Sequence, residues 1–154
     1  MSDYLLLLLA VFLTVGTGLF VASEFAIISS DRAQLEADRG SGEKGLDRSI
    51  RAISKTSTHL SSAQLGITLT TLLTGFVAEP AISRLISPWL ATFNLSAGAQ
   101  KSLSVVVAMT IATIFSFLIG ELVPKNMALA APKRVLKLVA VSYTHLTLPT
   151  KRIV

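Results

Sequence analysis

The chain has no cysteine and little charge. Charged residues make up 15% of its 154 residues, against about 25% in soluble domains. The missing thiols exclude disulfides, thiolate chemistry and zinc–thiolate sites. Aromatic residues reach only 6% and do not alternate with basic ones, so the net charge of +5 does not indicate a nucleic-acid partner. There is also no nucleophile beside a base, no glycine-rich phosphate loop and no histidine pair, so we expect no enzyme activity.

Apolar residues are abundant instead. They make up 51% of the chain, and the mean hydropathy is +0.65. Three stretches approach the roughly 20 residues that cross a bilayer, at about 4–30, 60–77 and 103–123. The first is too long for a signal-peptide core and has no Lys or Arg before it, so we expect it to remain as a spanning helix. The sequence therefore predicts an all-α membrane protein with three transmembrane helices.

The basic residues predict the orientation of these spans. The connection between the first and second spans holds Arg32, Arg39, Lys44, Arg48, Arg51 and Lys55. The next connection holds only Arg84 and Lys101, and basic residues resume at Lys125 after the third span. Because Lys and Arg mark the cytoplasmic side, the N-terminus is expected outside and the C-terminus in the cytoplasm.

Residues 31–58 are expected to form a cytosolic helical hairpin. Asp31 is suited to cap a first short helix, and the glycines between Gly40 and Gly45 would end it. Asp47 would then start a second helix. The mixed charges of this segment are typical of a solvated surface.

Two further short helices are predicted outside the spans. Glu79 and Pro80 suggest that a separate helix begins after the second span and lies at the interface, with Trp89 at headgroup level. Residues 127–140 alternate apolar and basic side chains, which indicates an amphipathic juxtamembrane helix along the inner leaflet.

The end of the chain differs in character from the rest. The apolar and basic rhythm stops abruptly after Ala140, and residues 141–154 resemble a translated sequencing adaptor. We therefore expect a membrane domain over residues 1–140, followed by a non-native tail over 141–154.

Glu121 places a carboxylate in the third predicted span, where inserting a charged side chain into the membrane costs free energy. A carboxylate at membrane depth costs about 2.5–3.5 kcal/mol and usually faces an ion or a partner. Pro124 has no N–H to give the carbonyl four residues back, so a helix break there would free the Gly120 oxygen beside the carboxylate. Two such oxygens predict part of a site for a hard cation. The alternative is a structural ion pair between Glu121 and Lys125.

Small polar residues recur at helical spacing within the spans. The second span carries such a row at Ser61, Gln64, Thr68, Thr71 and Gly75, the third at Thr113, Ser116 and Gly120, and the first at Thr14, Thr17 and Glu24. Such rows serve close helix packing, or they supply oxygen ligands that converge on Glu121. Glu24 would pair with Arg32 or another basic residue of the hairpin, extend its side chain to the membrane interface, or line an ion path.

Three motifs carry a family resemblance. They are Ser23-Glu24-Phe25-Ala26, Gln64-Leu65-Gly66-Ile67-Thr68-Leu69 and Gly120-Glu121-Leu122-Val123-Pro124-Lys125. Together they resemble the transmembrane domain of the CNNM/CorC family, whose bacterial members are also called HlyC/CorC or hemolysin-family proteins. The Gly-Glu-x-x-Pro-Lys ending is the specific part.

The resemblance implies a function and a set of ligands. It implies a homodimeric domain of the bacterial inner membrane that binds Mg²⁺ in an inward-facing cavity and exports it in exchange for Na⁺. By position, the ligands would be Thr17, Ser23, Ser62, Gln64, Gly120 and Glu121. Family members continue into cytosolic CBS domains, which are absent from this sequence. The competing interpretation is a membrane anchor and dimerisation module that serves those domains.

Overall fold

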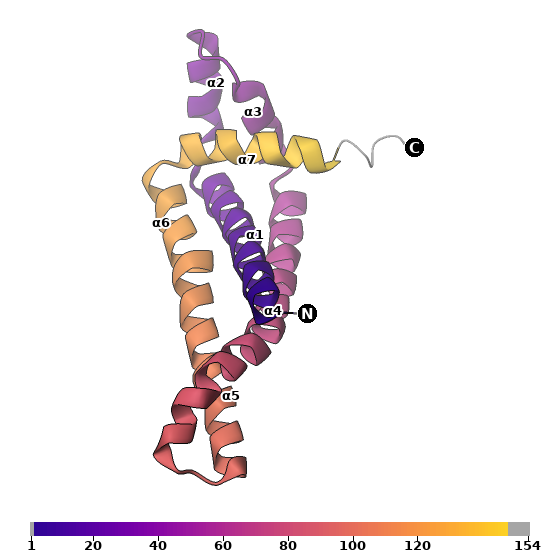
Figure 1. The fold of residues 1–154 in the computed structure, drawn as a ribbon. Helices are drawn as coiled ribbons and strands as arrows, with labels where there is room; N and C mark the ends of the chain where they lie inside the picture. Colours follow the sequence, from indigo (N-terminus) through magenta and orange to yellow (C-terminus); the bar gives the residue numbers. More distant parts are fainter. Residues whose placement is uncertain (1, 148–154) are drawn as a thin grey trace. The chain divides into compact units, whose positions relative to one another are not determined.

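The computed structural model describes residues 2–147, all of whose regular structure is helical (Figure 1). In chain order the elements are α1 (Asp3–Ser29), α2 (Arg32–Gly40), α3 (Leu46–Ser54), α4 (Thr56–Leu90), η1 (Ala91–Phe93), α5 (Ala97–Phe115), η2 (Ser116–Leu122), α6 (Val123–Ala130) and α7 (Pro132–Thr147). Three helical segments are long and apolar enough to cross a membrane: Asp3–Ser29, Thr56–Phe93 and Ala97–Ala130. The predicted all-α class with three spanning helices is confirmed.

The first span is one uninterrupted helix. At about 1.5 Å per residue its 27 residues extend for about 40 Å, which exceeds the roughly 30 Å of a hydrocarbon core. Its buried hydroxyl groups are satisfied within the helix. Thr14 Oγ1 donates to the Ala10 carbonyl at 2.9 Å, and Ser23 Oγ donates to that of Phe20 at 3.0 Å. Polar side chains therefore do not interrupt α1.

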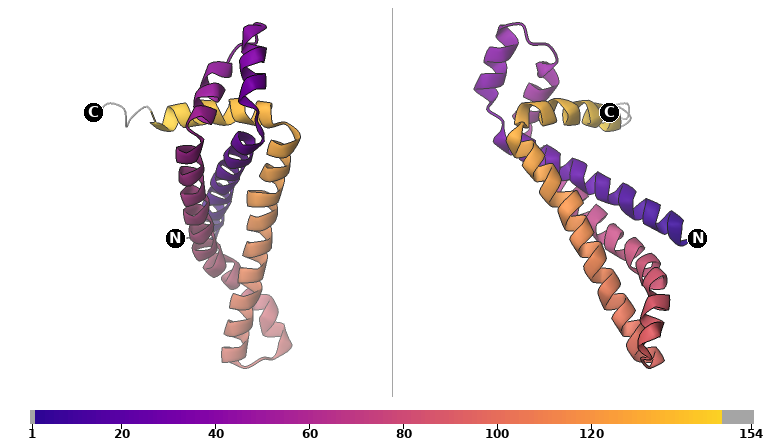
Figure 2. Two further views of the ribbon diagram at one scale, coloured as in Figure 1. Left: turned by 180° about the vertical axis from the view of Figure 1, so that it is seen from behind. Right: turned by 60° about the vertical axis from the view of Figure 1, so that its left-hand side comes forward.

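The helix that contains the second predicted span extends beyond it. α4 continues through both Pro80 and Pro88, so the expectation of a separate helix beginning at Glu79-Pro80 is wrong. Proline interrupts the backbone bonding of one turn, which a long helix tolerates by bending. Both Figures 1 and 2 show α4 changing direction in its second half. Trp89 is 78% exposed in this last part of the helix.

The third span contains a change of helix type. α5 passes into the π-helical segment η2, which passes into α6 without a break at Pro124. The predicted helix break at this proline is therefore wrong, and the chain first leaves the helix near Ala131. A π-turn pairs each N–H with the carbonyl five residues back and absorbs one extra residue. The distortion consequently lies ahead of the proline.

The chain divides into two compact units. Unit 1 comprises the chain up to Gly18 together with Gly66–Val123, and unit 2 comprises Leu19–Leu65 and the chain from Pro124 onward. In unit 1, Ala10, Ala78 and Ala112 form a small buried cluster between α1, α4 and α5. Small side chains of this kind let membrane helices approach closely.

An ion pair joins two helices at one end of unit 1. The Arg84 guanidinium contacts Asp3 Oδ1 through Nη2 at 2.7 Å and Nε at 2.8 Å. It connects the first turn of α1 to the second half of α4.

Unit 2 has its own apolar core. The α2–α3 hairpin packs on α7 (Figure 2). The core contains Ala26, Ile27, Leu35, Leu46, Ile50, Ala128, Val135, Leu136 and Val139. Leu46 and Leu136 are at most 1% exposed. The amphipathic pattern of α7 therefore serves packing against the hairpin as well as any contact with lipid.

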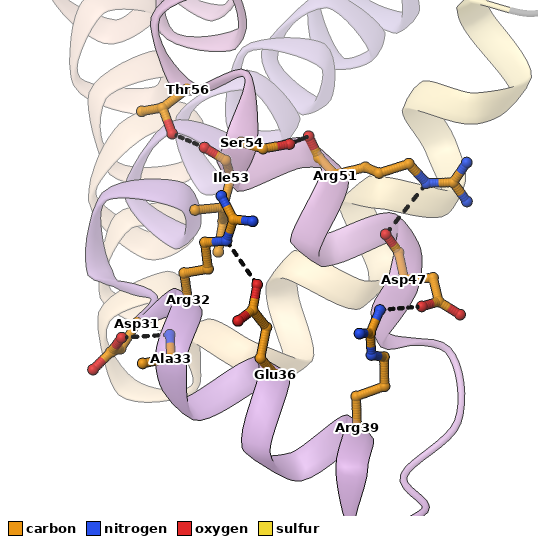
Figure 3. A network of polar contacts seen from close by, with 10 residues as sticks. All are labelled: Asp31, Arg32, Ala33, Glu36, Arg39, Asp47, Arg51, Ile53, Ser54 and Thr56. Carbon is orange, nitrogen blue, oxygen red and sulfur yellow. Dashed lines mark hydrogen bonds and ion pairs between the residues drawn. The ribbon is translucent and has the colours of Figure 1, made fainter.

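The hairpin has the predicted caps and charges (Figure 3). Asp31 Oδ1 accepts a hydrogen bond from the Ala33 N–H at 2.8 Å, which confirms it as the cap of α2. Arg32 pairs with Glu36 at 2.8 Å, and Arg39 pairs with Asp47 at 3.0 Å. α3 begins at Leu46, one residue before the predicted Asp47, because Gly45 adopts a left-handed conformation with φ of 83°.

Two lysines of α7 hold the hairpin electrostatically. Lys133 Nζ bonds Asp38 Oδ2 at 2.7 Å and also contacts Glu43, which Lys137 contacts as well. These contacts hold the pKa of Glu43 below its ordinary value of 4.5, and the hydrogen bond from Lys133 has the largest effect. The bonds to Asp38 and Glu43 raise the pKa of Lys133 above 10.5.

These shifts predict how hairpin stability depends on pH. A lowered carboxyl pKa stabilises the folded hairpin above pH 4.5, and this contribution is lost as the pH falls through the lowered value. A raised lysine pKa stabilises it below pH 10.5, and this contribution is lost as the pH rises through the raised value. Hydrogen-exchange protection of α2 and α3 is therefore expected to be constant near neutrality and to fall in acid. Glu43→Gln should weaken the acid-side loss, whereas Glu36→Gln, which alters an exposed pair within α2, should leave it in place. Equal acid-side losses in the two variants would contradict the role of Glu43.

The predicted non-native tail overlaps the end of α7. The helix runs to Thr147, and residues 148–154 of that tail lie outside the described residues.

Candidate functional site

The polar face of α1 in unit 1 is fully buried. Thr14 and Thr17 are both 0% exposed. Thr17 Oγ1 lies 2.7 Å from Thr70 Oγ1 on α4 and 3.1 Å from the Leu13 carbonyl oxygen. Thr70 Oγ1 in turn donates to the Gly66 carbonyl at 2.8 Å. Each hydroxyl has a single proton and donates it in these bonds. The Thr17 Oγ1 oxygen therefore keeps a lone pair that a cation can accept as a ligand.

η2 places Gly120 against this face of α1. A Cβ atom built on Gly120 would lie 3.4 Å from Thr14 Cγ2, 3.5 Å from the Thr14 carbonyl oxygen and 3.6 Å from Thr17 Cβ. Gly120 is thus buried directly against the two threonines. The structure therefore brings together Thr17 and Gly120, two of the predicted ligands, which are far apart in the sequence.

The π-helical register changes which carbonyl Pro124 affects. The Val123 N–H donates to the Leu118 carbonyl, five residues back. In this π-helical register, residue 124 would bond the carbonyl five residues back, which is that of Ile119. Because Pro124 has no N–H, the carbonyl that loses its hydrogen bond is that of Ile119, and not that of Gly120 as in an α-helix. The loosened turn therefore comprises Ile119 as well as Gly120. π-turns of this kind occur often at functional sites.

Glu121 follows Gly120 and is half-buried. Its carboxylate has no hydrogen-bond or ion-pair partner among the described residues of unit 1. Two hydroxyl oxygens of the same unit, Ser116 Oγ on η2 and Thr71 Oγ1 on α4, are buried without a hydrogen-bond partner in the described part of the chain. Unsatisfied buried oxygens are costly and call for an explanation such as an ion or a water molecule. Unit 1 therefore combines an unpaired carboxylate with unsatisfied hydroxyls.

Lys125, the structural partner considered for Glu121, has a contact of its own in unit 2. Its ammonium lies 4.8 Å from the centre of the Phe25 ring. That distance is within the range of a cation–π interaction.

The remaining predicted ligands belong to unit 2. Ser23 on α1 is 0% exposed. Ser62 and Gln64 lie on α4 and are exposed, and Ser62 Oγ donates to the Thr58 carbonyl at 2.8 Å. Glu24 is half-buried, and Arg32, one of the hairpin residues predicted to pair with it, pairs with Glu36 instead.

The polar row predicted on α4 does not form the packed face of this helix. Ser61, Gln64, Thr68 and Gly75 are exposed, and only Thr71 is half-buried. The packed row consists of Gly66, Thr70, Thr74 and Ala78 at intervals of four, of which Thr74 and Ala78 are buried and the other two are half-buried. At 3.6 residues per turn this row is centred about 120° around the helix from the predicted polar row.

Thr70 and Ser116 are two polar residues of unit 1 that the predicted ligand set lacked. The signal for Thr70 was the small-residue spacing of its row, which favours close approach of helices in membranes. Ser116 belonged to a predicted polar row, but only the structure shows that its oxygen is buried without a partner.

The donor set limits the kind of ion. Within residues 2–147 no three His, Cys, Asp or Glu side chains gather closely enough to hold a metal. A cation held beside Glu121 would therefore take its other ligands from hydroxyls, carbonyls and water. Such oxygens suit Mg²⁺, Ca²⁺ and Na⁺.

The fold and these contacts define a multi-pass membrane domain. Residues 8–148 match the family model of the cyclin M (CNNM) transmembrane N-terminal domain, and the chain belongs to this family.

Curated relatives support this assignment. The chain is 42% identical to UPF0053 protein MT1890 of Mycobacterium tuberculosis over 136 residues, which is 87% of this chain and 30% of that protein. It is 34% identical to UPF0053 protein YhdT of Bacillus subtilis over 140 residues, which is 91% of this chain and 30% of that protein. The chain thus spans about a third of the length of the relatives it matches.

Proposed function

We propose that this domain carries Mg²⁺ across the bacterial inner membrane and exports it from the cytoplasm in exchange for Na⁺. The observation that carries the proposal is the half-buried Glu121 carboxylate, which has no partner among the described residues of its unit. It follows directly on Gly120, which packs against Thr14 and Thr17. An unpaired charge in a spanning segment is costly, and a bound cation would offset that cost.

The coordination chemistry of Mg²⁺ indicates how the ion would be held. The ion prefers octahedral coordination at about 2.0–2.1 Å and loses water reluctantly. One carboxylate with hydroxyl and carbonyl oxygens replaces part of the hydration shell and leaves the remaining positions to water. The loosened η2 turn supplies backbone oxygens in the same place, as broken helices do in other transporters. We place the loading side in the cytoplasm because basic residues cluster before α4 and after η2.

A second candidate function is a membrane anchor that forms homodimers and serves cytosolic domains. The exposed polar row of α4 favours it, because Ser61, Gln64, Thr68 and Gly75 would otherwise face lipid within a spanning helix. Both functions include a dimer through this face. Only transport requires an ion at Glu121.

Flux measurements distinguish the two functions. The chain is reconstituted in proteoliposomes loaded with an Mg²⁺-sensitive dye, with and without an opposing Na⁺ gradient. Mg²⁺ flux that depends on the Na⁺ gradient is expected. Flux without Na⁺ dependence would refute the coupling, and dimers without flux would favour the anchor.

A further inference from the structure

The basic residues of the α2–α3 hairpin, together with the two α7 lysines that contact it, fall into two groups. In one group, Arg32, Arg39, Lys133 and Lys137 each contact a carboxylate. The other group is Lys44, Arg48, Arg51 and Lys55, all exposed and without a carboxylate partner in the part of the chain that the structure describes. We call Arg48, Arg51 and Lys55 the cationic face of α3. Together with Lys44, these residues carry the positive charge of the hairpin that no described carboxylate pairs with.

This face is continuous along the helix. Arg48 and Arg51 are three positions apart on one side of α3, Lys55 follows the helix directly as its C-cap residue, and Leu46, Ser49 and Ile50 are buried on the other side. Asp47, the one carboxylate of α3, bonds Arg39 through its side chain at 3.0 Å. Arg51 Nε reaches only the Asp47 carbonyl, at 3.4 Å (Figure 3). The terminal nitrogens of Arg51 therefore remain available to an external anion.

The cationic face lies next to a membrane entry point. Lys55 directly precedes Thr56, the first residue of a membrane-spanning segment. Arg48 is seven residues earlier, about 10 Å along a helix. This distance is about one Debye length at 0.1 M salt, so the whole face can sense the surface charge of the leaflet that α4 enters.

We propose that the cationic face of α3 binds the phosphate groups of anionic phospholipids in that leaflet. Charge complementarity carries the assignment, because uncompensated Lys and Arg beside a spanning helix attract anionic headgroups. The guanidinium of arginine also matches phosphate geometry with two parallel hydrogen bonds. The lipid would hold the hairpin at the membrane surface. This inference uses the membrane placement of α4 and does not require an ion at Glu121.

Lipid binding is measured on the purified chain in uncharged detergent without Mg²⁺. The chain is titrated with phosphatidylglycerol or phosphatidylcholine, and bound lipid is counted by native mass spectrometry. The triple variant Arg48→Ala, Arg51→Ala, Lys55→Ala is expected to lose phosphatidylglycerol affinity by about fivefold per residue, converted from about 1 kcal/mol per cation. Phosphatidylcholine binding should not change. Raising the salt from 0.05 to 0.5 M should reduce the preference for phosphatidylglycerol in the unmodified chain.

Two controls test the assignment. The conservative variant Arg48→Lys, Arg51→Lys should retain most of the binding, because the charge is kept. Lys101→Ala, which removes an exposed lysine near the start of the spanning segment Ala97–Ala130, should leave it unchanged. Unchanged phosphatidylglycerol binding in the triple variant would overturn the inference. Displacement of the lipid by equimolar polyglutamate peptide or inorganic phosphate would also overturn it, since the face would then recognise any anion. Neither result bears on Mg²⁺ flux, so a failure here is distinct from a failure of the transport proposal.

Discussion

Replacing Glu121 with glutamine is expected to remove most Mg²⁺-dependent stabilisation of the protein and to abolish Mg²⁺ flux. Glutamine keeps the size of the side chain and removes its charge. Changes to groups that only support a metal ligand already cost about 10–100-fold in affinity, and loss of the charged ligand should cost at least as much. At Mg²⁺ equal to 100 times the dissociation constant the unmodified protein gains about 2.7 kcal/mol. A 100-fold weaker site would gain about 0.4 kcal/mol at the same concentration.

Glu79→Gln is the matched control for this experiment. Glu79 is also half-buried in a spanning segment of unit 1, but it has no part in the η2 turn. Thermal unfolding in detergent with and without Mg²⁺ measures binding, and proteoliposome flux measures transport. Glu79→Gln should behave like the unmodified chain in both. If Glu121→Gln retains the stabilisation and the flux, Glu121 is not an ion ligand.

Enlarging Gly120 is expected to separate α1 from η2. A Cβ at this position would lie 3.4 Å or more from Thr14 and Thr17, so Gly120→Ala should be tolerated with little loss. Gly120→Leu would drive further carbons into the threonines, and overpacking of this kind typically costs about 1–3 kcal/mol. The leucine variant should therefore unfold at lower temperature and should lose Mg²⁺-dependent stabilisation.

Gly98→Leu serves as the comparison, since no atom lies within 4 Å of a Cβ built there. It should leave both the unfolding temperature and the Mg²⁺ response nearly unchanged. Equal effects of leucine at Gly98 and Gly120 would contradict the close contact between η2 and α1.

The helical content and the caps were predictable because they depend on local sequence. A run of apolar residues long enough to cross a bilayer leaves helix as the simplest way to satisfy its backbone. Asp31 was recognised as a cap because its hydrogen bond reaches only two residues along the chain. The errors arose at the prolines. Pro80, Pro88 and Pro124 all lie inside helices, since a long helix accommodates a missing N–H by bending or by widening one turn.

The packed side of α4 was less predictable. Two rows of small and polar residues run along this helix, and both have helical spacing. The structure buries the row containing Thr70 and exposes the row containing Gln64. Hydropathy does not show which of the two rows is packed, because a Ser or Thr hydroxyl can bond the backbone of its own helix and is then tolerated on the packed side and on the exposed side alike.

The sequence by itself determined three membrane-spanning helices, the uneven distribution of basic residues between their connections and the presence of one costly carboxylate near the end of the third span. These properties depend on composition and on spacing along the chain. Only the tertiary structure decided that Gly120 meets Thr14 and Thr17, that Thr17 bonds Thr70 and that the third span distorts ahead of Pro124. The reason is physical: the contacts of Gly120 and of Thr17 join residues more than 50 positions apart and depend on how closely two helices can pack, which no single helix specifies.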